Sequence, residues 1–217
     1  MTVTNRDKTR ANYDMLSRWY DWLAGSGEEK AQQVALALLN GQPGERVLEI
    51  GFGTGRTLRA LAQSVYPGGT LFGVDLSGGM CRVAQRKIRQ TKLENICLCQ
   101  ADAANLPFRA HSFDALLISF TLELFTLEEI PLVLQLCREI LQANGRLCIT
   151  AMSDQGQKGL MMRWYQWANR QFPDVIDCRP IDIYQLLQEA DFAILQTSHL
   201  SMWGLPIALV LAQPVQA

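Results

Sequence analysis

The spacing of apolar residues divides the chain into a helical start and a longer region in which strand-like and helix-like segments alternate. Near the N-terminus, aromatic and apolar side chains recur at every third or fourth position: Tyr13, Leu16, Tyr20 and Leu23. That spacing predicts an amphipathic helix. The glycines within residues 25–27 predict a break, and a second helix is expected over residues 28–39, closed by Asn40 and Gly41.

After Gly44 the pattern changes. Short apolar segments predict seven strands: Arg46–Ile50, Thr70–Val74, Ile96–Gln100, Phe113–Phe120, Arg146–Ala151, Phe192–Ser201 and Pro206–Ala212. Helical spacing between them predicts helices: Arg56–Val65, Ser77–Lys92, Pro131–Gln142, 159–170 and Asp182–Glu189. This alternation favours an α/β fold with a mostly parallel, doubly wound sheet and helices on both faces. The last two strand segments are close enough in sequence to pair antiparallel at the sheet edge, so we expect the last strand to be reversed.

Composition limits the classes of function. The chain has 217 residues, of which 48% are hydrophobic and 19% charged, as is typical of one globular domain. Its net charge is −1, so the chain lacks the excess of basic residues that is typical of a nucleic-acid-binding protein. The longest apolar run, residues 206–212, is too short to span a bilayer, and the N-terminal segment lacks the apolar core of a signal peptide. We expect a soluble, cytoplasmic protein with no nucleic-acid partner; peripheral membrane contact and the oligomeric state stay open.

Cysteine spacing argues against a metal or disulfide framework. Six cysteines stand at positions 81, 97, 99, 137, 148 and 178, and no two have C-x-x-C spacing. We therefore expect buried, reduced thiols and no bound metal.

Candidate chemistry gathers where strands are expected to end, because a doubly wound sheet binds its ligands beyond the carboxyl ends of its strands. The first strand leads through Glu49 into the turn Gly51-Phe-Gly53-Thr-Gly55, whose glycines permit a sharp turn and the close approach of a ligand. The second strand ends at Asp75, which can accept both hydroxyls of a ribose. Asp102 follows the third strand and can accept a hydrogen bond from an adenine amino group, and Ser119 ends the fourth.

Five stretches carry a resemblance to a known family: VLEIGFGTG from residue 47, GVDLSGGM from 73, QADAANLPF from 100, FDALLIS from 113 and REILQANGRL from 138. Over about half the chain they resemble the class I S-adenosylmethionine-dependent methyltransferases. Within that superfamily they are similar to small enzymes related to the ubiquinone/menaquinone C-methyltransferases and the bacterial phospholipid N-methyltransferases. The resemblance implies a Rossmann-like seven-stranded sheet, S-adenosyl-L-methionine as cofactor and a small-molecule methyl acceptor. One departure is the segment 142–145, expected as a turn, where relatives often have Lys-Pro-Gly-Gly.

The strand ends and the resemblance together name the expected cofactor-binding residues: Tyr20, Glu49, Gly51, Gly53, Gly55, Asp75, Leu76, Asp102, Ala103 and Ser119. The resemblance implies that the glycines would pack against the methionine and ribose portion of the cofactor. Leu76 would flank the adenine, and Asp102 and Ala103 would hold its polar edge. The resemblance also implies one methyltransferase domain over residues 1–217. It would comprise an N-terminal helical lid (1–41), a cofactor-binding core (45–152), and a substrate-side helix with a C-terminal strand pair (153–217).

No compact catalytic motif is visible, and the weaker candidates each have a structural alternative. Tyr20 either closes over the cofactor or is a buried aromatic of an amphipathic helix. Glu123 either faces the acceptor or is a surface acid at the start of a helix. His199 and His111 are better explained as a strand residue and a solvated loop residue. The Met- and Trp-rich segment 161–167 either lines an acceptor cavity or packs on the sheet.

The expected function is in-line methyl transfer to a small, hydrophobic acceptor: a quinone precursor, a lipid amine or a secondary metabolite. Two alternatives remain, an NAD-dependent oxidoreductase and a cofactor-binding protein without turnover. The first is less favoured because a dinucleotide fold needs a second mononucleotide-binding half, whereas this chain ends in an expected antiparallel pair.

Overall fold

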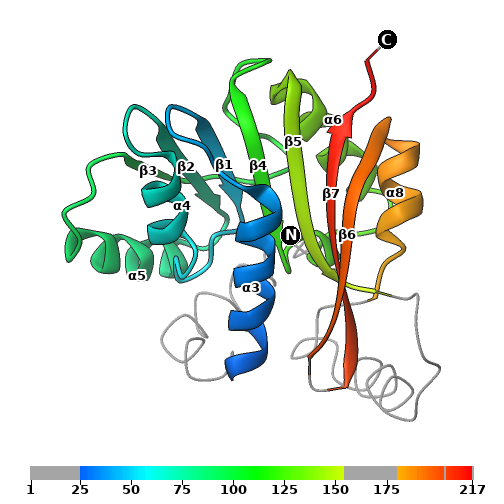
Figure 1. Ribbon diagram of the computed structural model, residues 1–217, viewed down its shortest axis with the longest axis horizontal. Coiled ribbons are helices and arrows are strands. Elements are labelled where there is room, and N and C mark those ends of the chain that lie inside the picture. Colours follow the sequence, from blue (N-terminus) through cyan, green and yellow to red (C-terminus); the bar gives the residue numbers. More distant parts are fainter. Residues whose placement is uncertain (1–24, 154–179, 203, 217) are drawn as a thin grey trace, which may run out of the picture.

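The structure, a computed structural model, describes residues 25–153, 180–202 and 204–216 (Figure 1). Its strands are β1 (Arg46–Ile50), β2 (Thr70–Asp75), β3 (Ile96–Gln100), β4 (Phe113–Ser119), β5 (Leu141–Met152), β6 (Phe192–Met202) and β7 (Leu205–Pro214). Its helices are α3 (Gly25–Leu39), α4 (Leu58–Val65), α5 (Gly78–Arg89), the 3₁₀ turn η1 (Leu122–Leu124), α6 (Ile130–Ile140) and α8 (Ile183–Glu189). The expected helices over 13–23 and 159–170 lie outside the described residues.

The strands form one seven-stranded sheet in the order β3-β2-β1-β4-β5-β7-β6. The pairings among β1 to β5 are parallel, and β7 runs antiparallel to both of its neighbours, β5 and β6. The doubly wound fold with a reversed last strand is therefore confirmed. Its physical origin is the short connection between β6 and β7, which allows a hairpin but no crossover helix.

Two apolar layers cover the sheet because successive strand residues point to opposite faces. Val47, for example, belongs to the apolar cluster that includes buried residues of α3, α4 and α5, whereas Leu48 belongs to the cluster that includes buried residues of α6 and α8. Both side chains are fully buried, as expected for central parallel strands covered on both sides. Among the described helices, none combines the length and apolar character needed to cross a bilayer.

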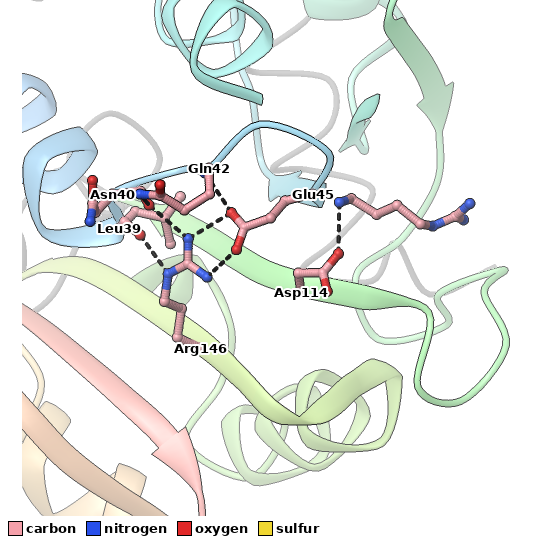
Figure 2. A network of polar contacts seen from close by, with 7 residues as sticks. Leu39, Asn40, Gln42, Glu45, Asp114 and Arg146 are labelled. Carbon is pink, nitrogen blue, oxygen red and sulfur yellow. Dashed lines mark hydrogen bonds and ion pairs between the residues drawn. The ribbon is translucent and has the colours of Figure 1, made fainter. Parts of the chain in front are cut away.

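A polar network joins the end of α3 to β5 at the amino ends of the strands (Figure 2). Arg146 donates from Nε to the Leu39 carbonyl (2.5 Å) and from Nη2 to the Asn40 carbonyl (2.9 Å). The same guanidinium binds both carboxylate oxygens of Glu45, at 2.7 and 2.8 Å. Burial by itself would raise the pKa of Glu45, but hydrogen bonds from Arg146 and from the Gln42 amide outweigh it and hold that pKa below its usual value.

Two segments differ from the sequence-based expectation. The helix predicted to reach residue 142 ends at Ile140, and β5 begins at once at Leu141 instead of after a turn. The extra residues are accommodated by a shift of register against β4 between Phe113 and Ala115, a bulge that hydrophobic periodicity does not reveal. Helix α3 begins at Gly25, inside the predicted break. The other element ends move by a few residues, as helix and strand boundaries commonly do.

The expectation of buried thiols holds for two cysteines and is wrong for two others. Cys137 and Cys148 are buried, and burial raises the pKa of each thiol to about 12. Cys97 and Cys99 are exposed because they lie on β3, the outermost strand on that side of the sheet. These four cysteines and the half-buried Cys81 form no disulfide among the described residues.

Candidate cofactor pocket

A pocket lies where β1, β2, β3 and β4 end. The first half of α3 extends past the carboxyl ends of β1 and β4 (Figure 1). Eight of the expected residues line the pocket: Glu49, Gly51, Gly53, Asp75, Leu76, Asp102, Ala103 and Ser119. Parallel strands bring these residues together because all of their carboxyl ends meet at one edge of the sheet. Tyr20 lies outside the described residues.

The three glycines of the turn have positive φ angles of +74°, +54° and +78°, but each meets a different neighbour. A Cβ on Gly51 would overlap Oγ1 of Thr121, so the turn packs directly against the segment after β4. A Cβ on Gly55 would stand 2.8 Å from a Leu58 methyl and 3.0 Å from the Ala84 Cβ. Gly55 therefore packs against the protein's own helices and is not among the described pocket residues, contrary to expectation. At Gly53 a Cβ would meet no described heavy atom within 4 Å.

Asp75 holds the turn in shape. Its Oδ2 accepts a hydrogen bond from the Gly53 amide and its Oδ1 accepts one from the Ser77 amide, both at 2.8 Å. Ser77 in turn caps α5, because its hydroxyl accepts from the Met80 amide at 3.1 Å. Asp75 therefore ties the glycine turn to the start of α5.

Glu49 is a buried carboxyl group with capacity to spare. It is 2% exposed, its Oε1 accepts a hydrogen bond from the Thr57 hydroxyl, and its Oε2 receives none from the described residues. Burial raises the pKa of Glu49 to about 8; the hydrogen bond from Thr57 opposes this rise and the nearby charge of Asp75 adds to it. A buried carboxyl group of this kind is stabilised in its charged form when a cation arrives beside it.

The outer strands supply the two ends of the pocket. On the β3 side, Asp102 accepts a hydrogen bond from the Ala104 amide at 2.9 Å. On the β4 side, the Ser119 carbonyl accepts one from the Thr121 hydroxyl at 2.9 Å, while the buried Ser119 hydroxyl has no partner among the described residues. The next residue, Phe120, has a backbone φ angle of +49°. Residues other than glycine rarely adopt this conformation, and those that do are concentrated at functional sites.

Sequence reasoning missed a second group of pocket residues. Glu28 and Gln32 reach the pocket from α3, and Phe120, Leu124 and Phe125 form an apolar end next to Ser119. Only the folded chain brings α3 to this edge. Arg56, in contrast, directly follows the glycine turn, so its position in the sequence is a signal that could have identified it.

Glu123 lies in the 3₁₀ turn η1 and is not the surface acid of one expectation. It is 1% exposed, so it is no surface acid, and it is absent from the described residues that line the pocket. Its Oε1 accepts a hydrogen bond from the Met152 amide at 3.2 Å, which connects η1 to the end of β5.

The two histidines lie away from the pocket. His199 is exposed on β6, the outermost strand, with its Nε2 3.4 Å from the Tyr184 hydroxyl. His111 precedes β4, at the opposite end of that strand from Ser119, and its Nδ1 lies 3.0 Å from the Leu141 carbonyl. Neither ring is close to the carboxyl ends of the strands that form the pocket.

Comparisons with known proteins point to methyltransferases. Residues 47–145 match the family model described as a methyltransferase domain. The chain is 33% identical to a demethylmenaquinone methyltransferase of a Geobacillus species over 93 residues, 43% of this chain and 40% of that protein. It is 28% identical to the demethylmenaquinone methyltransferase of Listeria welshimeri over 179 residues, 79% of this chain and 72% of that protein.

The fold also recurs among solved structures. Magnesium protoporphyrin IX methyltransferase of Synechocystis PCC 6803, solved with bound S-adenosylhomocysteine, has a TM-score of 0.68 over 86% of this chain and 83% of its own. With 21% sequence identity, that likeness is one of fold.

Proposed function

We propose that this chain is a class I S-adenosylmethionine-dependent methyltransferase and that its methyl acceptor is a small hydrophobic molecule of the quinone-precursor type. The observation that carries the proposal is the pocket itself. Asp75 and Asp102 line it from the ends of β2 and β3, and Phe120, Leu124 and Phe125 line it from the segment after β4, on the other side of β1 in the sheet. The relatives named demethylmenaquinone methyltransferases support the acceptor class.

The cofactor would lie across the strand ends. Asp75 would accept the ribose hydroxyls and Asp102 the adenine amino group, with Leu76 beside the ring. Glu49, buried behind the glycine turn, would accept the ammonium of the amino-acid portion. When bound, S-adenosylmethionine supplies a methyl group on a positively charged sulfur, and the electron pair of the broken bond stays on that sulfur.

The charges of the pocket argue against a dinucleotide. Its described lining holds four carboxyl groups: Glu28, Glu49, Asp75 and Asp102. A pyrophosphate would be repelled by this lining, whereas a ligand with a ribose, an ammonium and a sulfonium is attracted to it. The oxidoreductase alternative is therefore not favoured.

The acceptor would approach from the apolar end formed by Phe120, Leu124 and Phe125. These side chains can exclude water and align a ring with the methyl group, and alignment alone can supply much of the rate. If the acceptor is a ring carbon of a quinol, that carbon attacks the methyl group and then loses its proton to a base. Neither histidine of the described strands and loops is positioned for that step.

The first test is a calorimetric titration with S-adenosylhomocysteine, with reduced nicotinamide dinucleotide as the comparison. We expect saturable binding of the first only; binding of the dinucleotide alone would contradict the cofactor assignment. Transfer of a labelled methyl group from S-adenosylmethionine is then measured with a demethylmenaquinol and, as a matched lipid, with phosphatidylethanolamine.

Label in the quinol alone supports the acceptor class. Label in the lipid amine alone would reject it. Binding of S-adenosylhomocysteine without transfer to either acceptor, or to cell extracts, would identify a cofactor-binding protein that does not turn over.

A further inference from the structure

One positive side chain lies among the described residues that line this otherwise acidic pocket, and it is Arg56. The amino-acid portion of the proposed cofactor carries one carboxylate, which needs a positive or hydrogen-bond-donating partner in so acidic a site. The buried carboxyl group of Glu49 suits the ammonium of the cofactor's amino-acid portion, so the cofactor's carboxylate needs a different partner.

Contacts with α3 show at which end of the pocket Arg56 lies. Its Nη1 is 3.7 Å from Oε2 of Glu28. Glu28 belongs to α3, and α3 packs against β4, β5, β6 and β7. Asp75 ends β2 and Asp102 follows β3, on the other side of β1 in the sheet order. Arg56 is therefore directed away from the adenosine end, toward the side on which the amino-acid portion would lie.

We propose that Arg56 binds the carboxylate of the cofactor's amino-acid portion and that the enzyme thereby selects ligands that carry this group. The inference rests on the proposed function, because it names the partner of one group of the same cofactor. A guanidinium has five N–H donors in a planar fork and pairs with carboxylates in a bidentate geometry.

Glu28 is a positioning residue in this scheme. The side chains of Arg56 and Glu28 are 23% and 11% exposed, so the pair is shielded and well defined. The contact holds the guanidinium at the junction between the glycine turn and α3.

The test compares two ligands that differ by one group. S-adenosylhomocysteine carries the carboxylate; 5′-(3-aminopropylthio)-5′-deoxyadenosine, its decarboxylated analogue, keeps the adenosine, the thioether and the ammonium. We expect the wild-type protein to bind the first at least about tenfold more tightly, since hydrogen bonds to charged groups contribute about that much affinity or more. A ratio near one in the wild-type protein would overturn the inference without any variant.

Arg56→Gln then removes the guanidinium. We expect it to weaken S-adenosylhomocysteine by about 10- to 100-fold and to change the decarboxylated analogue by no more than about twofold. The analogue thus reports whether the pocket of the variant stays intact. Equal losses for both ligands would show a structural role, and no loss for either would show no role; each result overturns the proposal.

Arg59→Gln is the matched control, because Arg59 is an exposed arginine three positions further on, outside the described pocket lining. It removes the same charge from the same helix region and should leave the ratio at its wild-type value. A similar fall in both variants would mean that general charge, not a contact at Arg56, sets the preference. Failure of the wild-type protein to bind S-adenosylhomocysteine at all would instead refute the proposed function.

Discussion

Gly53→Ala separates the cost of backbone strain from the cost of blocking the pocket, because the chain contains a matched control. Gly53 and Gly44 have φ angles of +54° and +88°, and at both positions an added Cβ would meet no described heavy atom within 4 Å. Gly53 lines the pocket, whereas Gly44 stands in the turn that leads into β1, at the other end of that strand. The two substitutions therefore impose the same kind of strain at different places.

The magnitude follows from that geometry. A left-handed conformation costs a non-glycine residue about 1–2 kcal/mol, and no clash adds to it at either site. Both variants should lose about 1 kcal/mol of unfolding free energy, equivalent to a fall in Tm of about 2–4 °C for a chain of this size. Only Gly53→Ala places a methyl group where the cofactor would approach. It should weaken S-adenosylhomocysteine by at least about tenfold, or about 1.4 kcal/mol.

Urea unfolding followed by tryptophan fluorescence measures the first quantity, and calorimetric titration measures the second. Equal affinity of the two variants would refute the close approach of the cofactor at Gly53. A stability loss several times larger in Gly53→Ala than in Gly44→Ala would show a contact that the geometry does not contain.

Three further substitutions test other parts of the structure. Arg146→Ala removes the bidentate pair with Glu45 and the hydrogen bonds to the end of α3, and should cost about 3 kcal/mol in urea unfolding at pH 7. Because the pKa of Glu45 is depressed in the folded protein, the stabilisation that its carboxylate contributes is present above the unfolded pKa and is lost as the pH falls. The difference in unfolding free energy between the wild type and Arg146→Ala should therefore shrink below about pH 4. A difference that stays constant with pH would contradict the assignment. The pKa of Glu49 is raised to about 8, so the unfolding free energy of the ligand-free protein should fall as the pH rises from about 5 to 8, on the order of 1 kcal/mol per pH unit. Glu49→Gln should flatten that slope, and an unchanged slope would assign it to another group. Gly55→Ala adds a clash with α4 and α5 to the strain of a +78° φ angle, and should lower the unfolding free energy by about 2–4 kcal/mol, more than Gly53→Ala. Equal losses in the two variants would mean that the helices can move apart at little cost.

Local patterns in the amino-acid sequence determine much of this protein. Strand β1 and strand β3 have the bounds that their runs of apolar residues predicted, because each is a short apolar segment between turns. The glycine turn and the acids Asp75 and Asp102 could be placed at one edge because parallel strands align their carboxyl ends. Such features depend on residues close in sequence and on a simple topological rule.

Long-range packing decided the rest. Three features depend on segments that are far apart in the chain. Glu28 approaches Arg56, Glu123 is buried against the end of β5, and Gly55 packs against helices. The pKa of Glu49 is likewise set by how fully the folded chain excludes water from it. Periodicity records which side chains avoid water, but only the assembled sheet and helices determine which of them meet. Most of the candidate ligand-binding residues could therefore be identified in the sequence. The tertiary structure decided their pKa values and which other side chains they contact.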